Sequence, residues 1–370
     1  MGSVLPRPKR MSGESGVPMS APSQAPESAD QPTSADAVEE SEAMAGHGGS
    51  DNRSLRQIAW QRLKRDKVAM VSGVVVALLI LAAILAPLLT KWFGYPPTEY
   101  HQDLVDPSTR LPFKDPENPY DEFGYAITDP WGGISSDHWL GVEPTTGRDL
   151  LSRLLHGAQI SLLVAFLSTL VCVGLGTVLG IIAGYKGGWV DTLISRAMDI
   201  FLAFPLMLFA IALVGVIPDG LLGLTGNGLR IGVIVFIIGF FNWPYIARIV
   251  RGQTLSLRER EFVEAARSLG AGNRHILVKE ILPNLITPIL VYSTLLIPTN
   301  ILFEAALSFL GVGINPPTPS WGKMLSEAIP FYQNGPYFVV FPGLAIFITV
   351  LAFNLFGDGL RDAFDPKTSD

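Results

Sequence analysis

Six apolar segments dominate the pattern of hydrophobic and polar positions along this chain. Each approaches the roughly 20 residues that an α-helix needs to cross about 30 Å of hydrocarbon. The pattern therefore predicts an all-α polytopic membrane protein with six transmembrane helices. The expected spans lie near residues 68–90, 159–184, 192–217, 229–250, 285–311 and 338–357.

The composition excludes an ordinary soluble domain. Apolar residues make up 48% of the chain and charged residues only 16%, and the mean hydropathy is +0.35. The single cysteine, Cys172, lies inside an apolar segment. The chain can therefore form no internal disulfide or cysteine metal site.

The first 52 residues are rich in Ser, Ala, Pro, Gly, Glu and Asp and contain almost no aromatic or β-branched residues. Such a segment buries too little apolar area to offset its chain entropy. We expect residues 1–52 to be a disordered cytoplasmic tail, either a plain solvated extension or a partner-binding segment. The basic patch Arg7–Arg10 is followed by polar residues, which argues against a signal peptide.

Residues 53–67 carry six Arg or Lys, five of them from Ser54 onward, around a short apolar face formed by Leu55, Ile58, Ala59 and Leu63. We expect an amphipathic helix here. It either lies on the anionic inner surface of the membrane or simply forms a basic flank of the first span.

The distribution of Lys and Arg predicts which side of the membrane each connection faces. With alternate connections assigned to the cytoplasm, and with the Lys and Arg near the ends of spans counted with the adjoining connection, 20 of the 27 Lys and Arg lie inside and 7 outside. The connection between the fourth and fifth spans, together with Arg248 at the end of the fourth, carries 7 of them, against 1 after the fifth span. Because cytoplasmic loops carry the excess of Lys and Arg, this connection and both termini, including residues 358–370, are expected in the cytoplasm.

The connection at residues 91–158 carries eleven Asp and Glu among many Pro, Gly and aromatic residues. Its prolines exclude a regular helix or strand throughout, so we expect an extracytoplasmic loop or small irregular subdomain. Its acidic face either receives a basic partner or is simply solvated. A core transmembrane domain is expected to follow at residues 159–357.

Two features of the spans predict close packing or polar function. Gly176, Gly180 and Gly184 share one stripe of the second span and permit close approach of another helix, in this chain or in another subunit. Ionisable residues are costly inside a span and should not face lipid. For Asp199 in the third span, Arg196 three residues earlier predicts a local ion pair or a helix-end contact.

The fifth span carries a polar stripe. Asn300, Glu304 and Ser308 recur at four-residue spacing, and Ser293 lies one heptad before Asn300. We expect this stripe either to line a water-accessible translocation path or, for Glu304, to make a buried hydrogen bond between helices.

The segment Glu261–Asn284 is a charged, helix-forming island between two apolar spans. Phe262, Ala265, Ala266 and Leu269 fall at i, i+3, i+4 and i+7 and form one narrow apolar face. Its small centre suits a groove on another protein, although the same face also suits the bilayer or the chain itself.

Charged residues frame this apolar face. Arg258, Arg260 and Arg267 surround it. Glu261 and Glu264 occupy the early turns, where the helix dipole favours carboxylates. Gly270 follows directly and suits a C-terminal stop.

The sequence EAARSLG with LPN downstream resembles the cytoplasmic EAA loop of ABC-transporter importer permeases. The family pattern is Glu-Ala-Ala, a Gly four residues on, and Ile-x-Leu-Pro after nine more. In this chain Glu280 stands where the pattern has Ile, and Ile281 is displaced by one position. The residues in register are Glu264, Ala265, Ala266, Gly270, Leu282 and Pro283.

Further stretches resemble the C-type subunit of the dipeptide/oligopeptide/nickel importer subfamily. The segment HWLGVEPTTGRDLLSRLLHGAQISL is similar to its HxLGTDxxGRDxxSRxxxGxRxSL, with Val142, Glu143 and Gln159 as departures. The segments AGYKGGWVDTLISRAMDIFLAFP, ILFEAALSFLGVGINPPTPSWGKML and FPGLAIFITVLAFNLFGDGLRDAFDPK are also similar to that subunit. The resemblance covers residues 54–367, within which 91–130 is longer than the family leads us to expect.

The resemblance implies a type I importer fold and alternating access in a cytoplasmic (inner) membrane. The EAA loop, residues 251–283, would carry a coupling helix at about Arg258–Gly272 that fits a cleft on an ATP-binding subunit. The implied partners are a homologous B-type permease, one or two ATP-binding subunits that hold ATP and Mg, and a substrate-binding lipoprotein that delivers peptide. Pro316, Pro317 and Trp321 would form a rim for that binding protein or an interfacial anchor.

No hydrolytic chemistry is expected of the chain itself. It contains no GxxxxGK[ST] phosphate loop, so ATP must be bound elsewhere. No metal site is expected either, because the five His show no ligand spacing. They are His47, His101, His138, His156 and His275.

Three alternatives remain open from the sequence. The same subfamily includes nickel-chelate importers, and substrate choice would rest largely with the binding protein. A proton-coupled secondary transporter with Glu304 as proton carrier, or a membrane scaffold whose charged loop recruits a signalling protein, would belong to different classes. Neither needs ATP-binding subunits on the Glu261–Asn284 island.

Overall fold

The structure is a computed structural model that describes residues 55–93, 95–214, 220–221 and 224–364. The predicted tail, residues 1–52, lies outside the described residues, as does the end of the predicted cytoplasmic C-terminus from 365 onward. Apart from two paired two-residue strands, the regular elements of the described part are helical. The expected all-α polytopic architecture is confirmed.

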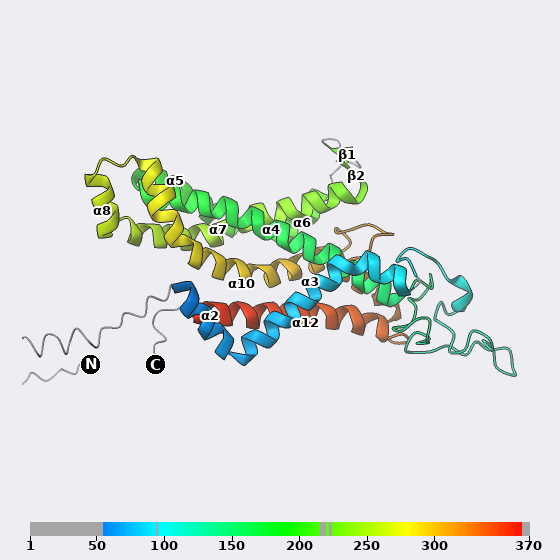
Figure 1. Cartoon of the computed structure of the whole chain (residues 1–370). Coiled ribbons are helices and arrows are strands. Elements are labelled where there is room, and N and C mark those ends of the chain that lie inside the picture. Colours follow the sequence, from blue (N-terminus) through cyan, green and yellow to red (C-terminus); the bar gives the residue numbers. More distant parts are fainter. Residues whose placement is uncertain (1–54, 94, 215–219, 222–223, 365–370) are drawn as a thin grey trace, which may run out of the picture. The chain divides into compact units, whose positions relative to one another are not determined.

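Within the described residues, five long helices are apolar enough to cross a membrane (Figure 1). The expected first, second, fourth and sixth spans lie within them, and the expected fifth span, 285–311, runs two residues beyond the end of its helix at Phe309. Their bounds are α3 (Lys67–Phe93), α4 (Leu150–Lys186), α7 (Gly226–Leu257), α10 (Leu282–Phe309) and α12 (Tyr337–Phe364).

The expected third span, residues 192–217, is not one straight helix. Residues 215–217 lie outside the described part, and the rest belongs to α5 (Gly188–Ala203) and α6 (Leu206–Val214), which are bent by 76° at the break between them. Pro205 lacks a backbone N–H and disfavours the helical conformation of the residue before it. Phe204 accordingly adopts an extended conformation, with φ −80° and ψ 128°. The pair amounts to a broken span or a re-entrant segment.

Short elements connect these helices. Helix α2 (Leu55–Arg65) precedes α3. Between α6 and α7, the strands β1 (Gly220–Leu221) and β2 (Leu224–Thr225) pair antiparallel. The remaining elements are η1 (Gln102–Leu104), α8 (Glu261–Ser268), α9 (Asn273–His275), the π-helix η2 (Ile276–Ile281), α11 (Trp321–Ala328) and η3 (Ile329–Phe331).

The glycine stripe of α4 packs against α7 within the same chain. A Cβ on Gly176 would lie 2.8 Å from the Trp243 carbonyl oxygen, and one on Gly180 would lie 2.7 Å from the Ala247 carbonyl oxygen. Gly184 meets Thr254 one turn further on. Of the two alternatives for this stripe, intrachain packing is what the structure shows.

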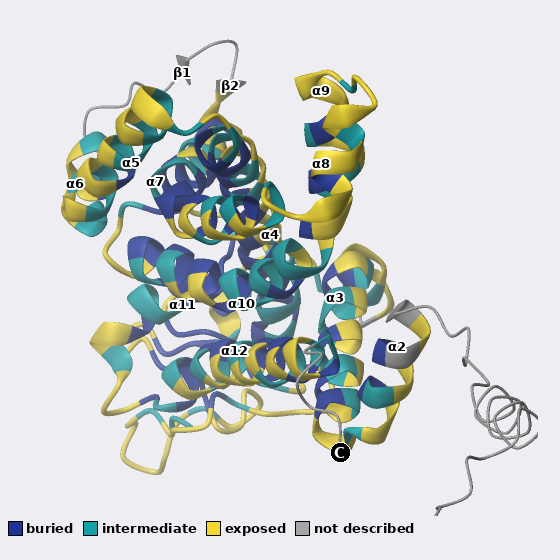
Figure 2. Ribbon diagram, turned by 90° about the vertical axis from the view of Figure 1, so that its left-hand side faces the viewer, coloured by how far each residue is buried: buried dark blue, intermediate teal, exposed yellow. Residues whose placement is uncertain are grey.

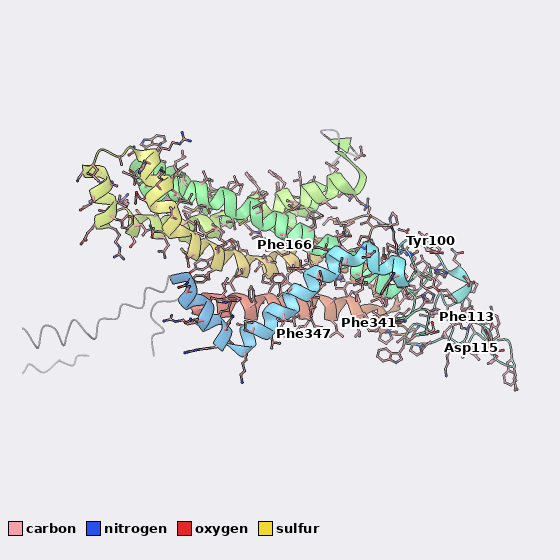
Figure 3. The ribbon with its side chains drawn as sticks, viewed as in Figure 1. Tyr100, Phe113, Asp115, Phe166, Phe341 and Phe347 are labelled. Atoms are coloured by element: carbon pink, nitrogen blue, oxygen red, sulfur yellow. The ribbon has the colours of Figure 1, made fainter. Side chains whose placement is uncertain are left out.

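The core lies between the long helices, as the burial colours show (Figure 2). One cluster joins α3, α4, α10, α11 and α12, and a second joins α4, α6, α7 and α10. Phe166 of α4 meets Phe353 of α12 edge to face, with ring centroids 6.0 Å apart (Figure 3).

Helix α2 places Ala59 and Leu63 against the chain itself, in a cluster with Ala69 and Ala363. Two residues of the expected membrane-facing stripe are thus buried by α3 and α12. Asp66 then begins α3, where its Oδ1 accepts hydrogen bonds from the amides of the next turn at 2.9 and 3.1 Å.

The connection between α3 and α4 is an irregular subdomain held by isolated bridges such as Val105 with Pro112 and Phe113 with Thr128. Phe113 is buried within it (Figure 3). Burial opposes ionisation of Asp106, but hydrogen bonds from the Ser108 hydroxyl and from the Thr109 hydroxyl and amide outweigh it and lower the pKa of Asp106 to about 2. The loop is therefore a folded unit and not a plain solvated linker.

Candidate functional site

Helix α8 presents two different faces. Val263 is fully buried and packs with Ile276 and Ile281 of the π-helix η2. Phe262 is 37% exposed and Leu269 is 89% exposed. Glu261, Glu264, Ala265 and Arg267 are exposed as well, and Ala266 is half-buried. Of the apolar face expected from the sequence, the edge formed by Phe262, Ala265 and Leu269 therefore points away from the chain.

The end of α8 is fixed by its backbone. Gly270 has φ +85°, which favours glycine. Its amide donates to the Arg267 carbonyl, and the Ala271 amide donates to the Ala266 carbonyl, both at 3.0 Å. This is the Schellman arrangement of a helix C-terminus, and it holds the exposed Leu269 at the tip of the loop.

Three polar contacts tie this loop to the turn between α4 and α5. Arg258 donates from Nη1 to the Gly184 carbonyl at 2.9 Å, and the Tyr185 hydroxyl contacts Asn273 Oδ1 at 3.0 Å. Arg251 forms a two-point ion pair with Asp191, with Nη2 to Oδ2 at 2.6 Å. The α8 region is thereby linked to α4 and α5 as well as to the two helices that it joins.

The polar stripe on α10 faces α4. Asn300, Glu304 and Ser308 are fully buried, so the expectation that they line a water-accessible path is not met in this chain. Glu304 accepts hydrogen bonds from Ser161 and Ser308, each at 2.7 Å. The structure favours the alternative of a buried interhelical hydrogen bond.

The two remaining stripe residues differ in where they bond. Asn300 donates from Nδ2 to Thr169 Oγ1 on α4 at 2.9 Å. Ser293 is half-buried, and its hydroxyl donates a hydrogen bond to the Ile289 carbonyl of the same helix at 2.6 Å. Helix α10 is thus joined to α4 by side-chain hydrogen bonds at two levels.

A groove of about 430 Å³ lies on another side of α10, between it and α7. Most of its lining is apolar, with four polar side chains among the wall residues. Asn242 is 5% exposed, and its Nδ2 has no hydrogen-bond partner within the described part of the chain. The lining residues are Asn242, Tyr245, Ile246, Ile249, Tyr292, Leu295, Leu296, Thr299 and Phe303.

The ionisable residue of the third span is held by two arginines. Asp199 meets Arg248 of α7 at 2.8 Å and Arg196 at 3.7 Å. The local pair with Arg196 is present, but the shorter contact crosses to α7. Half of the Asp199 side chain remains exposed.

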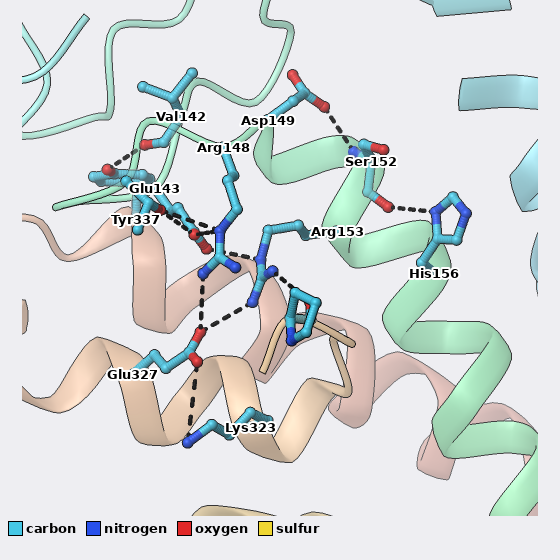
Figure 4. A network of polar contacts seen from close by, with 12 residues as sticks. Val142, Glu143, Arg148, Asp149, Ser152, Arg153, His156, Lys323, Glu327 and Tyr337 are labelled. Carbon is cyan, nitrogen blue, oxygen red and sulfur yellow. Dashed lines mark hydrogen bonds and ion pairs between the residues drawn. The ribbon is translucent and has the colours of Figure 1, made fainter. Parts of the chain in front are cut away.

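The motif around the start of α4 forms a buried charge network (Figure 4). Glu143 pairs with Arg148 and, at 2.7 Å, with Arg153. Arg153 also meets Glu327 of α11 at 3.0 Å. Two carboxylates and two guanidinium groups balance one another where isolated charges would be costly. The network joins the loop between α3 and α4 to α4 and α11.

The expectation that Trp321 forms an exposed rim or interfacial anchor is wrong. The side chain is 1% exposed, packs on Gly157, and donates from its indole to the Leu154 carbonyl at 3.0 Å. Ser320 caps α11 immediately before it and fixes this inward orientation. Pro316 and Pro317 are exposed, as a rim requires.

Sequence reasoning missed several of these groups. Val263 lay one position off the assumed apolar face, and Asn242 stood alone in an apolar span. The charges of Glu143, Arg148 and Arg153 were visible only as part of a motif. A clue to the network was available, because two Arg and a Glu within eleven residues at the edge of a span need partners.

Comparisons with known proteins agree with this architecture. Residues 176–370 match the family described as binding-protein-dependent transport system inner membrane component. Residues 54–112 match the N-terminal transmembrane domain of oligopeptide transport permease C.

Two relatives illustrate the match. The dipeptide transport system permease protein DppC of Alkalihalophilus pseudofirmus is 42% identical over 309 residues, which cover 84% of this chain and 89% of the relative. The glutathione transport system permease protein GsiD of Escherichia coli is also 42% identical over 309 residues, covering 83% and 89%.

Among solved structures, the chain is similar to a chain of the MetNI methionine ABC transporter in an inward-facing conformation. The identity is 19%, the TM-score is 0.47, and the match covers 58% of this chain and 97% of that one. The sequence matches over most of the chain establish that it belongs to the family of inner membrane permease components of binding-protein-dependent ABC transport systems.

Proposed function

We propose that this chain is one permease subunit of an ATP-driven importer of dipeptides or oligopeptides. The substrate class is supported by the relatives DppC and GsiD, which are permease proteins of a dipeptide and of a glutathione transport system. The observation that carries the coupling role is the exposed apolar edge of α8, held at a fixed place by contacts with α4 and η2.

Helix α8 would dock into a cleft on an ATP-binding subunit. Phe262 and Leu269 supply apolar area, and Ala265 between them allows close approach. Arg258, Glu261, Glu264 and Arg267 surround this edge with charge and set its orientation on the partner. Gly270 fixes the end of the helix. ATP and Mg would be held by that partner, because this chain contains no phosphate loop.

Force on α8 has two routes into the membrane region. One runs through η2 into α10, and the other runs through Arg258 and Tyr185 into the end of α4. Since α10 and α4 are joined by the Glu304 and Asn300 hydrogen bonds, they would move together. Ser293, Asn300, Glu304 and Ser308 would thus belong to the moving unit and not to its wet surface.

The groove between α7 and α10 is the better candidate for the translocation path. It is open on one side, and Asn242, Tyr245, Tyr292 and Thr299 offer polar groups for a peptide backbone. A homologous B-type permease facing this groove would complete the channel. Both termini and α8 would lie in the cytoplasm, and the loop between α3 and α4 outside, where a binding protein could contact Pro316 and Pro317.

The test is to disrupt the exposed edge of α8 and leave its buried face intact. The variant Leu269→Asp, with Ser268→Ala as the matched exposed control, is expressed with its neighbouring transporter subunits. We expect Leu269→Asp to insert normally, to lose co-purification of the ATP-binding subunit, and to reduce uptake of a labelled dipeptide at least about tenfold. The Ser268→Ala control should resemble the wild type.

Undiminished dipeptide uptake by Leu269→Asp would contradict the coupling role of α8. Loss of ATP-binding subunits together with uptake driven by a proton gradient would instead support a secondary transporter. Binding-protein-stimulated ATP hydrolysis measured against a panel of dipeptides, longer peptides and nickel chelates would then identify the substrate class.

A further inference from the structure

A second cavity lies at the opposite end of the helices from α8. It has a volume of about 360 Å³ and lies between the end of α3, the outer loop and the first turns of α4. Its lining residues are Thr90, Trp92, Tyr95, Ser136, Asp137, Trp139, Asp149, Leu151, Ser152 and Leu155. The proposed coupling and translocation roles use none of these residues.

The polar groups of this cavity are suited to a cation. Its described lining contains two carboxylates, Asp137 and Asp149, and no Lys or Arg. The same two carboxylates act on Tyr95. Partial burial raises the pKa of its hydroxyl, and the negative charges of Asp137 and Asp149 raise it further. A positively charged group entering the cavity would therefore meet a negative potential.

One hydroxyl in the cavity lacks a partner. Ser152 is 3% exposed, yet among the described residues its Oγ finds no hydrogen-bond partner. Its backbone amide already donates to Asp149 Oδ1 at 2.7 Å, as Figure 4 shows. A buried polar atom left unpaired is costly, so Ser152 Oγ points to a hydrogen-bonding ligand in the cavity.

The number of acceptors matches a primary ammonium group. Such a group has three N–H donors, and the cavity offers Asp137, Asp149 and the Ser152 hydroxyl as acceptors. The carboxylate of Asp149 also holds His138 at 2.9 Å and caps α4, so it is fixed in place before a ligand arrives. The indoles of Trp92 and Trp139 add aromatic surface that attracts cations.

The surroundings indicate that this ammonium group belongs to a lipid. Leu81, Ile84 and Leu88 form an exposed apolar stripe on α3 that leads toward the cavity. Trp92 is 87% exposed at the end of the same helix, where tryptophan marks the interface of a membrane. Lys91 beside it is exposed and supplies a positive charge for a phosphate.

We propose that the cavity between α3 and α4 binds the head group of a phosphatidylethanolamine lipid. The ammonium group enters between Asp137, Asp149 and Ser152, the phosphate lies near Lys91, and the acyl chains follow the exposed stripe of α3. A bound lipid would connect α3 to the loop that carries the α4 start. This site goes beyond the proposed transport function and does not depend on it.

The test uses the assembled transporter, purified in detergent and exchanged to remove native lipid. Phosphatidylethanolamine, phosphatidylcholine and phosphatidylglycerol with identical acyl chains are added in turn, and bound lipid is counted by native mass spectrometry. We expect phosphatidylethanolamine to bind at least about tenfold more tightly than the other two. Phosphatidylcholine has no N–H donors, and phosphatidylglycerol has no cation.

Two variants localise the binding. Asp137→Asn and Ser152→Ala should each weaken phosphatidylethanolamine binding about three- to tenfold, the effect of losing one hydrogen bond of ordinary net strength. Asp103→Asn removes an exposed carboxylate of the same loop outside the cavity and should leave binding unchanged. Equal binding of all three lipids, or equal effects of Asp137→Asn and Asp103→Asn, would overturn the proposal.

A soluble arm separates the lipid from a free amine. Ethanolamine and glycerophosphoethanolamine are added as competitors of the bound lipid. We expect displacement only at concentrations at least about a hundredfold above that of the lipid, because the acyl chains contribute most of the apolar contact. Displacement by ethanolamine at matched concentration would show that the site takes a soluble amine, and the lipid proposal would then be wrong.

Discussion

The two ends of this protein stabilise their side chains in opposite ways. At the α8 end, Leu269 is almost fully exposed and the loop is attached by a few polar contacts at its flanks. At the α4 start, Arg153 and Glu143 are almost fully buried and form an ion pair within the chain. The first end exposes apolar surface that our proposal assigns to a partner protein, whereas the charges of the second end are paired within the chain. Substitutions should therefore affect assembly at the first end and folding at the second.

The largest effect is expected at the self-contained end. Arg153→Ala leaves Glu143 buried with one of its two cationic partners removed, and breaking a buried ion pair in this way costs about 3–5 kcal/mol. We expect a large fall in the thermal unfolding temperature of the detergent-purified transporter. Lys323→Ala, near Glu327 but outside the Glu143 pair, is the control. A normal unfolding temperature for Arg153→Ala would remove the contrast between the two ends.

The next effect lies midway between the ends. Gly180→Val places side-chain atoms against the Ala247 carbonyl and Val250 on α7, and such overpacking costs about 1–3 kcal/mol. We expect reduced stability in the same melting assay and reduced uptake. Gly174→Ala is the matched control on α4, because nothing lies within 4 Å of a Cβ there. Equal melting temperatures for both variants would mean that α4 and α7 separate easily.

A smaller effect on stability is expected at the α8 end. Arg258→Ala removes the hydrogen bond to the Gly184 carbonyl, and for a half-exposed group the cost is about 1 kcal/mol. We expect nearly unchanged melting but a several-fold loss of binding-protein-stimulated ATP hydrolysis. Arg274→Ala, on the exposed side of the same loop, is the control. A loss of stability without a loss of coupling would reverse our assignment of this end.

The smallest effect concerns the turn at Asp106 in the loop between α3 and α4. Its lowered pKa means that the ionised form stabilises the loop above about pH 4, and that this contribution is lost as the pH falls toward 2. Asp106→Asn should mimic the acid form at neutral pH and make the loop easier to cut by a protease. Asp103→Asn should not. Identical cleavage of the two variants would show that the Asp106 turn adds nothing to the loop.

Much of the helical architecture was predictable from hydropathy, and the errors have physical causes. The sequence places the second span at 159, but α4 begins at Leu150, because Asp149 caps it and the charged first turns are satisfied by partners from the loop. Hydropathy detects only apolar stretches. It therefore cannot detect helical turns whose charged side chains are paired with other parts of the chain. The break at Pro205 was not readable from the proline alone, because Pro244 and Pro298 lie inside continuous helices.

The orientation of side chains was harder to predict. The sequence favours functional roles for Glu304 and Trp321, yet both side chains form hydrogen bonds with α4. The partner residues Ser161 and Leu154 lie more than 140 residues away in the chain, so no local pattern reveals them. The α8 face was nearly correct, because a short amphipathic helix follows its own periodicity.

The continuity of the helical path from Asn273 through η2 to Phe309 has a consequence for insertions and deletions. Removing one residue between Ile281 and Thr299 rotates everything beyond it by about 100°. Glu304 would then leave Ser161. The loop between α3 and α4 near Phe123, which is 83% exposed, is irregular, so a deletion there shifts no helical register. Natural length variation should therefore accumulate in the outer loop and be excluded from α10.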